Sequence, residues 1–486
     1  MPRRTKIVAT LGPASESREV LEAIIRAGVD VVRLNFSHGS AEEHIRRAQM
    51  VREIAAVQGR AVGVLADLQG PKIRIDRFRN GPVDLAEGRQ FTLDAEMAAD
   101  AGHQEAVGIA YKTLPQDVSP GNILLLDDGK IVLKVDQVMG QKVVCTVEVG
   151  GKLSDRKGIN LMGGGLSAPA LTDKDKQDIR TAAQLQADYV AVSFPKDADD
   201  MHQARQLLRD AGGLGGVVSK IERWEALQVI EQIIEASDGV MVARGDLAVE
   251  IGDAEVPGWQ KRLIKMSRDM NRVVITATQM MESMITTPTP TRAEVSDVAN
   301  AVLDGTDAVM LSAESASGKY PVKAVEALVR VCLAAEKERV TQISAHRMNL
   351  EFRHIDEAIA MATMYTANHL KVRAIACLTE SGSTTRWLSR IRSGIPIYAL
   401  TRHEATRRRV TLYRGVYPID FDITSPATPI VMQGVMDTLK AKGAVQDGDL
   451  IIVTRGDFTG IAGRTNTMKI LRVGEDLSAH PSIGDE

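Results

Sequence analysis

The sequence is poor in aromatic residues and in cysteine, and it has no long apolar run. Aromatic residues make up only 3% of the 486 positions, so Val, Ile, Leu, Ala and 19 Met must form its cores. Cys145, Cys332 and Cys377 are too far apart to form a CxxC metal motif, and their odd number favours a reducing compartment. No segment approaches the roughly 20 apolar residues of a membrane-spanning helix.

A large excess of charge of one sign is also missing. The formal net charge is only -3, which argues against a nucleic acid as the main partner. The start is basic, but the apolar segment Ile7–Thr10 that follows is too short for the core of a signal peptide. We therefore expect a cytoplasmic protein that binds neither nucleic acid nor a membrane, with room for about three or four domains.

Eight short apolar segments end at polar residues, and stretches of helical period separate most of them. Segments that are apolar on both faces are typical of buried parallel strands. Periodicity does not distinguish a barrel from an open sheet, but eight β-then-α units favour a closed (β/α)₈ barrel with its active site at the carboxyl ends of the strands. The segments are Lys6–Thr10, Asp30–Asn35, Ala61–Asp67, Asp188–Ser193, Val217–Glu222, Gly239–Arg244, Val273–Thr278 and Ala308–Glu314.

A long segment with a different pattern separates the third unit from the fourth. Two hairpin signals, Asp127–Lys130 and Met139–Lys142, join short β segments in it. Pro71 stands at one border and Gly163–Gly165 at the other. We expect an all-β insertion beside the barrel mouth that swings over the substrate as a lid. The alternative is a rigid decoration.

Helices and strands alternate again in the last part of the chain, which predicts a C-terminal open-sheet α/β domain. The segment Thr379–Thr385 lies between a strand and a helix start. Its hydroxyls and backbone N–H groups suit an anion. Ser and Thr are also ordinary N-caps of helices, so an anion site and a simple helix cap are equally supported. The predicted division is a catalytic barrel over 1–70 and 169–345, a β-barrel lid domain over 71–168 and an effector-binding domain over 346–486.

The most informative charges follow two neighbouring apolar segments. Lys220 and Glu222 end one of them, and Asp246 follows the next. Charges at the carboxyl ends of such strands project into the crevice where α/β proteins bind ligands. A Lys beside two carboxylates indicates a hard divalent cation next to an anionic, phosphorylated substrate.

Seven motifs, in order along the chain, resemble those of the pyruvate kinase family, and the C-terminal domain is similar to the family's regulatory domain. The motifs are Lys6–Ser15, Arg33–Gly39, Asp67–Arg74, Ser219–Glu222, Val242–Asp246, Thr276–Met280 and Met310–Glu314. The resemblance covers the whole chain and implies a barrel, a β lid inserted after its third strand and an effector domain. It also implies the glycolytic transfer of the phosphoryl group of phosphoenolpyruvate to ADP, which gives pyruvate and ATP.

The resemblance implies a role for each charged position. Glu222 and Asp246 match the ligands of the family's Mg²⁺, with Mn²⁺ as the alternative ion. Lys220 matches the lysine that contacts the phosphoryl group in flight, where a compact ammonium stabilises the spread charge. Arg33 and Arg74 match phosphate-binding arginines, which can donate bidentate hydrogen bonds.

Further roles follow from the same resemblance. The backbone N–H groups of Gly245 and Asp246 match those that receive the substrate carboxylate. Thr278 matches the threonine beside the enolate carbon, where it positions a proton relay that includes water. The positions on the nucleotide side are Thr10, Pro13, His38, Arg74 and Lys157.

One departure from the family pattern changes the expected ion requirement. Asn35, Ser37 and Asp67 match positions that help to hold a K⁺ ion in the family. Members with Lys in place of a particular Glu tend not to need that ion, and Lys72 stands at this position here. We therefore expect the Lys72 ammonium to replace K⁺ and the enzyme to be K⁺-independent.

The C-terminal domain resembles the family's site for allosteric effectors. The implied ligand is a sugar phosphate or a nucleoside monophosphate, and Arg455 and Arg464 are expected to contribute. The resemblance also implies a homotetramer. The expected effector residues are Thr379, Ser381, Ser383, Thr384 and Thr385.

Two other classes of function compete with this reading. A barrel lyase or aldolase could use Glu and Asp to hold Mg²⁺ under a pyruvate enolate, but it would not explain Lys220, the lid or the nucleotide-side motifs. A non-catalytic metabolite sensor could keep the fold. Loss of Lys220, Glu222 or Asp246 would favour a sensor, and all three are present.

Overall fold

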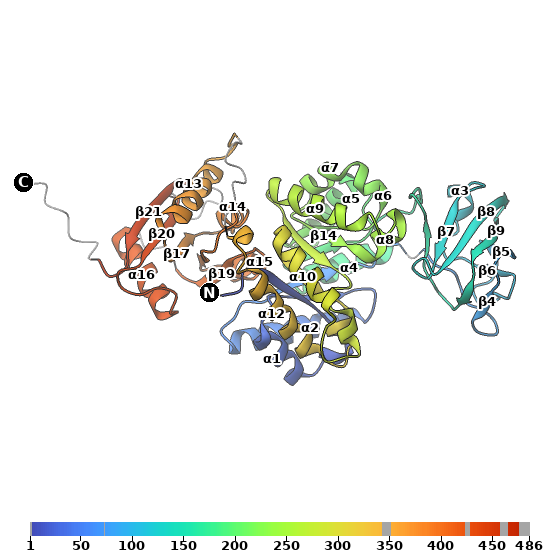
Figure 1. The fold of residues 1–486 in the computed structure, drawn as a ribbon, viewed down its shortest axis with the longest axis horizontal. Helices are drawn as coiled ribbons and strands as arrows, with labels where there is room; N and C mark the ends of the chain where they lie inside the picture. Colours follow the sequence, from blue (N-terminus) through green and yellow to red (C-terminus); the bar gives the residue numbers. More distant parts are fainter. Residues whose placement is uncertain (1, 72, 343–350, 423–427, 457–464, 476–486) are drawn as a thin grey trace, which may run out of the picture.

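The computed structural model describes residues 2–71, 73–342, 351–422, 428–456 and 465–475. Figure 1 shows an elongated molecule with the barrel in the middle, the β insertion at one end and the C-terminal sheet at the other. Among the described residues, no helix has both the length and the apolar character needed to cross a bilayer.

Eight parallel strands close into a barrel in the order β1-β16-β15-β14-β13-β12-β3-β2, so the predicted barrel is confirmed. Its strands are buried on both faces, because helices cover the outside and side chains fill the inside. The strands are β1 (Lys6–Leu11), β2 (Val31–Asn35), β3 (Gly63–Asp67), β12 (Tyr189–Val192), β13 (Gly216–Ile221), β14 (Gly239–Ala243), β15 (Val273–Ala277) and β16 (Ala308–Leu311).

The barrel helices follow from local sequence signals. Thr291 caps α10 in the predicted capping box with Glu294, and Gly305 ends the same helix with φ of +98°. Apolar faces of the helices pack against the outer faces of the strands. The helices around the barrel are α1 (Arg18–Ala27), α2 (Ala41–Val57), α4 (Asp173–Gln184), α5 (Ala198–Asp210), α6 (Trp224–Gln228), α7 (Ile230–Ala236), α8 (Arg244–Ile251), α9 (Val256–Asp269), α10 (Arg292–Asp304) and α12 (Pro321–Ala335).

The insertion is all-β, as expected, with one short helix, α3 (Leu114–Asp117). Both predicted hairpin turns are present, because β8 pairs with β7 and β9 on either side. The six-stranded sheet β11-β7-β8-β9-β5-β6 stays open, since its edge strands do not pair with each other in the described residues, and the expected lid barrel is not closed. The strands are β4 (Val83–Leu85), β5 (Gln90–Asp94), β6 (Ala106–Gly108), β7 (Ile123–Leu126), β8 (Ile131–Met139), β9 (Lys142–Val149), β10 (Gly151–Leu153) and β11 (Ile159–Leu161).

The C-terminal domain is an open sheet in the order β19-β18-β17-β20-β21, with β21 antiparallel to its neighbour. The predicted α/β domain is therefore confirmed. Its elements are α13 (Ile355–Leu370), β17 (Ala374–Leu378), α14 (Ser383–Ser389), β18 (Ile397–Thr401), α15 (Glu404–Val410), β19 (Val416–Asp420), α16 (Thr428–Ala441), β20 (Leu450–Arg455) and β21 (Thr467–Arg472).

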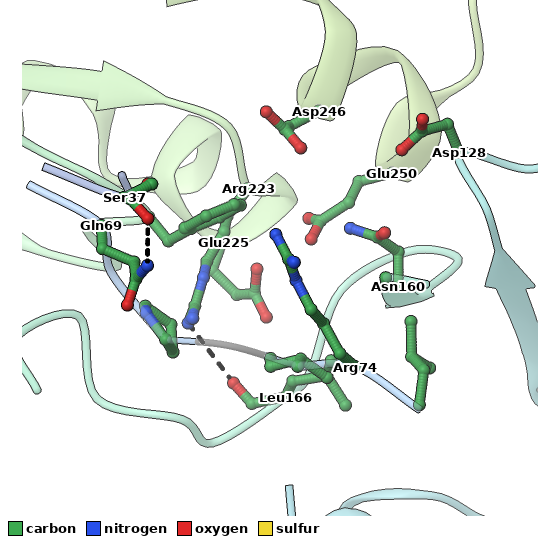
Figure 2. Close-up of a pocket in the computed structure, with 15 residues that line it drawn as sticks. Ser37, Gln69, Arg74, Asp128, Asn160, Leu166, Arg223, Glu225, Asp246 and Glu250 are labelled. Carbon is green, nitrogen blue, oxygen red and sulfur yellow. Dashed lines mark hydrogen bonds between the residues drawn. The ribbon is translucent and has the colours of Figure 1, made fainter. Parts of the chain in front are cut away.

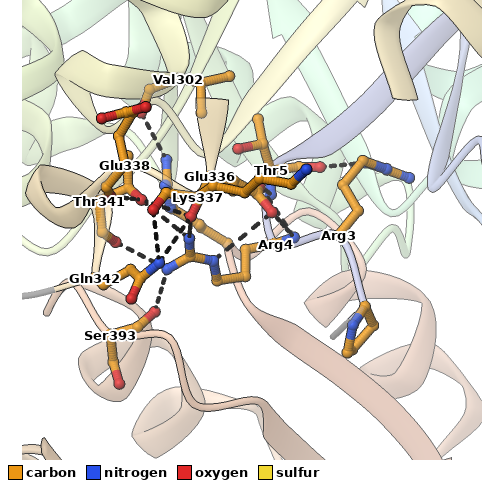
Figure 3. Close-up of polar contacts among 12 residues, drawn as sticks. Arg3, Arg4, Thr5, Val302, Glu336, Lys337, Glu338, Thr341, Gln342 and Ser393 are labelled. Carbon is orange, nitrogen blue, oxygen red and sulfur yellow. Dashed lines mark hydrogen bonds and ion pairs between the residues drawn. The ribbon is translucent and has the colours of Figure 1, made fainter. Parts of the chain in front are cut away.

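Buried arginines join this domain to the base of the barrel. The guanidinium of Arg4, just before β1, donates to the backbone oxygens of Thr341 at 2.8 Å and Ser393 at 2.6 Å, as Figure 3 shows. The Glu336 carboxylate accepts from the Arg4 backbone N–H at 2.9 Å and lies 3.7 Å from its guanidinium. Arg390, after α14, pairs with Asp307 at the start of β16. The start of the chain therefore helps to fix the C-terminal domain to the barrel.

Candidate active site

Polar side chains from several strands meet at the carboxyl ends of the barrel strands. Lys220 lies on β13, and its ammonium donates a 2.7 Å hydrogen bond to the Ser193 hydroxyl, directly after β12. The same ammonium lies 3.0 Å from a carboxylate oxygen of Glu222 and 3.3 Å from one of Asp67. Arg33 on β2 binds the other Asp67 oxygen at 2.5 Å. The cluster thus spans the ends of four consecutive strands, β13, β12, β3 and β2, with cations and carboxylates in contact with one another.

Backbone contacts hold this cluster in place. The Thr10 hydroxyl accepts from the Arg33 guanidinium at 3.0 Å and donates to the Leu311 carbonyl at 2.8 Å, which ties β1 to β16. The second carboxylate oxygen of Glu222 accepts from the Phe194 N–H at 2.9 Å. Phe194 adopts a left-handed conformation with φ of +54°, which is uncommon for a bulky residue.

Burial and charge set the protonation states. Burial and the nearby Asp246 raise the pKa of Glu222 to about 7, although Lys220 opposes the shift. Burial also raises the pKa of Asp246. Burial works against the charged form of Asp67, but Arg33 and Lys220 hold its pKa below the usual value. Burial likewise opposes the charge of Lys220, but Asp67 and Glu222 raise its pKa above the usual value, so its ammonium stays protonated.

Glu222 and Asp246 form a donor set that fits Mg²⁺. Within the described residues, no group of three or more His, Cys, Asp or Glu is arranged to hold a metal. Both carboxyl groups have raised pKa values, and burial is the main cause of the shift in each. Mg²⁺ is usually held by one or two carboxylates together with substrate oxygens and water, so this buried, undercompensated pair suits it.

Thr278 and Gly245 form a second part of the site at the ends of β15 and β14. The Thr278 hydroxyl accepts from the Gly245 N–H at 3.0 Å and donates to the Ala277 carbonyl at 2.6 Å. Thr278 has φ of +65°, a strained conformation for a β-branched residue. The buried Arg244 side chain binds the carbonyls of Ala277 and Thr278 and pairs with Asp297 at 2.6 Å, so it supports this turn.

A cavity of about 180 Å³ lies between the barrel and the insertion, and Figure 2 shows its lining. Arg74 points into it toward Glu250, and Asp246 lines it from the barrel side. The Arg74 guanidinium donates no hydrogen bond to a described residue, so it is available to a ligand. A larger cavity of about 940 Å³ shares Asp128, Asp246 and Glu250 with the first and gives space beside the carboxylate pair.

The expected nucleotide positions are spread over the barrel and the insertion. Thr10 belongs to the Lys220 cluster through Arg33. Pro13 begins a short 3₁₀ helix, and the carbonyl of His38 contacts the ring of His44 at 2.9 Å. Lys157 lies in the insertion, where its ammonium pairs with Asp127 at 2.7 Å. Among the described residues, no hydrogen bond or ion pair links the side chains of Pro13, His38 or Lys157 to the Lys220 cluster.

Two of the residues expected at the K⁺ position, Asn35 and Ser37, are in direct contact. The Asn35 side-chain oxygen accepts from the Ser37 N–H at 3.1 Å, and Ser37 lines the smaller cavity together with Asp246. The third position, Asp67, is bound by Arg33 and Lys220. Lys72 and Arg464 lie outside the described residues.

The expected effector residues make contacts in two different places. Thr384 contacts the Thr465 hydroxyl at 2.6 Å, and the hydroxyls of Thr379 and Thr385 are used within their own turn. Ser381 and Ser383 instead line a cavity against the base of the barrel. The five residues therefore do not converge on one point.

Several residues that shape the site were not predicted to have a specific role. Ser193 binds Lys220 and is the polar end of its strand segment, a signal visible in the sequence. Arg223 donates to the Ala168 carbonyl at 3.2 Å and anchors the return from the insertion. Glu250 accepts from the Trp224 N–H at 2.7 Å, and burial raises its pKa to about 7. Arg223 and Glu250 read as ordinary helix and loop charges in the sequence.

Comparisons with known proteins agree on one family. The family model described as "Pyruvate kinase, barrel domain" matches residues 2–325, and "Pyruvate kinase, alpha/beta domain" matches residues 357–471. The chain is similar to pyruvate kinase II of Salmonella typhimurium, with 57% identity over 97% of this chain and 99% of that protein. A pyruvate kinase of Haemophilus influenzae is 55% identical over 97% of this chain and 99% of its own. A solved pyruvate kinase from Cryptosporidium parvum aligns with a TM-score of 0.90 and 33% identity, covering 97% of this chain and 96% of that one.

Proposed function

The chain belongs to the pyruvate kinase family, and from that premise we propose which of its residues carry out the reaction. The reaction itself transfers the phosphoryl group of phosphoenolpyruvate to ADP and gives pyruvate and ATP. The family implies a divalent metal ion. The observation that supports the residue assignments is the buried cluster of Lys220, Asp67 and Glu222, with Asp246 beside it, at the ends of barrel strands.

Lys220, Arg33 and Arg74 bind the phosphoryl group as it moves. The raised pKa of Lys220 keeps its ammonium charged, and Arg33 is held toward it by Asp67. Charge in the transition state spreads over the phosphoryl oxygens, where fixed cations stabilise it without reorganising. Glu222 and Asp246 hold Mg²⁺, or Mn²⁺ in its place, which when bound neutralises charge on the phosphate.

Gly245, Asp246 and Thr278 act on the other end of phosphoenolpyruvate. The Gly245 N–H donates to the Thr278 hydroxyl, and the substrate carboxylate binds to this N–H and to that of Asp246. The Thr278 hydroxyl then orients a water that protonates the enolate carbon, because a threonine hydroxyl is too weak an acid to do this alone.

The nucleotide lies between the barrel and the insertion. Thr10, Pro13 and His38 line its barrel side, Arg74 its phosphates, and Lys157 reaches it from the insertion. The cavities between the two domains support this assignment, since Arg74 and Asp128 come from the insertion side and Asp246 from the barrel. The insertion over 71–168 acts as a lid that closes on the substrates and limits water.

The enzyme does not need K⁺. The Lys72 ammonium supplies the positive charge that K⁺ would bring, while Asn35, Ser37 and Asp67 still shape the site. Activity in tetramethylammonium salts should not rise when K⁺ is added, whereas Lys72→Glu should make activity depend on K⁺. A large K⁺ activation of the unaltered chain would overturn this proposal.

Regulation and assembly complete the proposal. A sugar phosphate or nucleoside monophosphate binds at the loop that carries Thr379, Ser381, Ser383, Thr384 and Thr385, in the domain over 346–486. The barrel is formed by 1–70 and 169–345. Four chains associate in the cytoplasm. The large exposed side chains Ile355, Tyr365 and Leu370 on α13 support association, because such apolar surface favours burial against another chain.

A steady-state assay tests the proposal. It measures ADP-dependent pyruvate formation from phosphoenolpyruvate with Mg²⁺, with and without K⁺ and with candidate phosphorylated activators. We expect activity that depends on ADP and Mg²⁺ together, which separates this reaction from that of a lyase or aldolase. Replacing Ser383 and Thr384 with Glu should remove activation and leave basal turnover, and unchanged activation would exclude the loop.

A further inference from the structure

A third cavity lies at the opposite end of the barrel from Lys220. It has a volume of about 170 Å³, which is room for a small anion and a few waters. Its barrel wall includes the starts of β12 and β13, and its other wall comes from α14 and α15, on the barrel side of the C-terminal sheet in Figure 1. A ligand here would touch both domains at once.

The charge on the cavity walls is mainly positive. Arg209 contributes from the barrel, and Arg386 and Arg409 contribute from the C-terminal domain. The carboxylate that lines the cavity, Asp238, is already engaged, because it pairs with Arg205 at 2.6 Å and accepts from a backbone N–H. The positive charge therefore exceeds the negative charge at this place.

Two of these arginines have unused donors. The Arg386 guanidinium donates no hydrogen bond to a described residue, and its Nε is completely buried without a partner. The Nε of Arg409 is in the same state, although another of its nitrogens donates to the Leu214 carbonyl at 2.6 Å. A buried Nε has no surface open to the cavity, so it is the terminal guanidinium nitrogens of Arg386, which donate to no described residue, that are available to a ligand.

The arginines also repel each other. Burial lowers the pKa of Arg272, and Arg386 lowers it further. Burial and Arg205 lower the pKa of Arg209 in the same way. Arg409 also lowers the pKa of Arg209, and because both of these arginines line the cavity, an anion between them would relieve that repulsion.

We propose that this cavity binds a phosphate dianion, either inorganic phosphate or the phosphoryl group of a small ester, between the barrel and the C-terminal domain. Arginine side chains suit this ligand because their planar groups donate paired hydrogen bonds to its oxygens. The Ser381 hydroxyl lines the same cavity and offers a neutral donor. The cavity is separate from the Thr384–Thr465 contact, so the proposal does not depend on the effector role of Thr384 and Thr385. Because its walls come from two domains, the bound anion would also stabilise their contact.

The test measures binding of inorganic phosphate and of glycerol 3-phosphate to the full chain by calorimetry, at constant ionic strength set with chloride. Arg386→Gln should weaken binding of the preferred probe roughly tenfold or more, because a charged donor is lost. Arg386→Lys keeps the charge, so its affinity for the probe should lie between those of the unaltered chain and Arg386→Gln. Arg402→Gln, an exposed arginine in the same domain, should leave binding unchanged, and Thr384→Val, at the proposed effector loop, separates binding at that loop from binding in this cavity.

Each result of these binding measurements either identifies the kind of ligand or overturns the proposal. Tighter binding of the ester identifies a metabolite site, and equal binding identifies a site for the ion itself. No binding of either probe to the unaltered chain would overturn the proposal. So would unchanged binding in the Arg386→Gln variant, or a loss confined to Thr384→Val, which would assign the anion to the loop. Basal turnover and circular dichroism of each variant exclude misfolding as the cause of a loss.

Discussion

Replacing Lys220 with Met should remove most of the catalytic rate while leaving substrate binding largely intact. The ammonium lies about 3 Å from carboxylate oxygens of Glu222 and Asp67, in a cluster that is almost completely buried. A phosphoryl oxygen about 4 Å from this charge would gain about 4 kcal/mol at an effective dielectric of 20. Since about 1.4 kcal/mol corresponds to a factor of ten, this energy sets an upper limit of roughly a thousandfold.

Water that enters the emptied space will recover part of that energy. We therefore expect kcat to fall by roughly a hundredfold to a thousandfold. The assay is steady-state pyruvate formation with phosphoenolpyruvate varied at saturating ADP and Mg²⁺. Lys152→Met, an exposed lysine in the insertion, is the matched control and should retain full activity. Normal turnover by Lys220→Met, or a loss confined to KM, would refute the assignment.

Three further predictions follow from the structure. Burial beside Asp246 raises the pKa of Glu222 to about 7, so protons compete with the metal for this carboxylate. The apparent Mg²⁺ affinity should therefore be weaker one pH unit below that value than one unit above it. Equal affinities in Mg²⁺ titrations at the two pH values would contradict this. Ser193→Ala removes the hydroxyl that orients Lys220 but keeps the charge, so kcat should fall by roughly tenfold, less than in Lys220→Met. Arg4→Gln breaks the buried contact with Glu336 and should lower the free energy of unfolding by about 3 to 5 kcal/mol in calorimetry. Arg18→Gln, at an exposed pair, should change it by less than about 0.5 kcal/mol.

Much of the fold could be predicted from the sequence because buried parallel strands leave a simple pattern. All eight barrel segments became strands, and the capping box at Thr291 begins α10 where expected. Strand ends were less accurate. The segment expected to continue through Arg244 stops at Ala243, because Arg244 begins α8 and turns its side chain to the β15 carbonyls.

The insertion was less predictable. The two hairpins were correct, since their turn residues tolerate positive φ, as at Asp127, Asp128 and Gly140. The open sheet could not be predicted, because closure depends on the pairing of edge strands that are far apart in the chain. Long-range pairing of this kind leaves no local signal.

Part of the candidate site could also be predicted from the sequence, and part of it could not. Lys220, Glu222 and Asp246 could be singled out because charges that directly follow apolar strands are unusual. The supporting contacts of Arg244 with the Thr278 turn, and of Arg223 with the Ala168 carbonyl, join segments distant in sequence. Such contacts become visible only when the chain is folded.

The central claim is that two carboxylates hold the metal next to the lysine that meets the phosphoryl group. The most direct measurement is a crystal structure of the full chain with Mn²⁺ and phosphoenolpyruvate, with the ion located by its anomalous scattering. The ion is expected to bind oxygens of both Glu222 and Asp246, with the phosphoryl group in contact with the Lys220 ammonium. An ion bound away from those carboxylates, or a phosphoryl group out of reach of Lys220, would contradict the account.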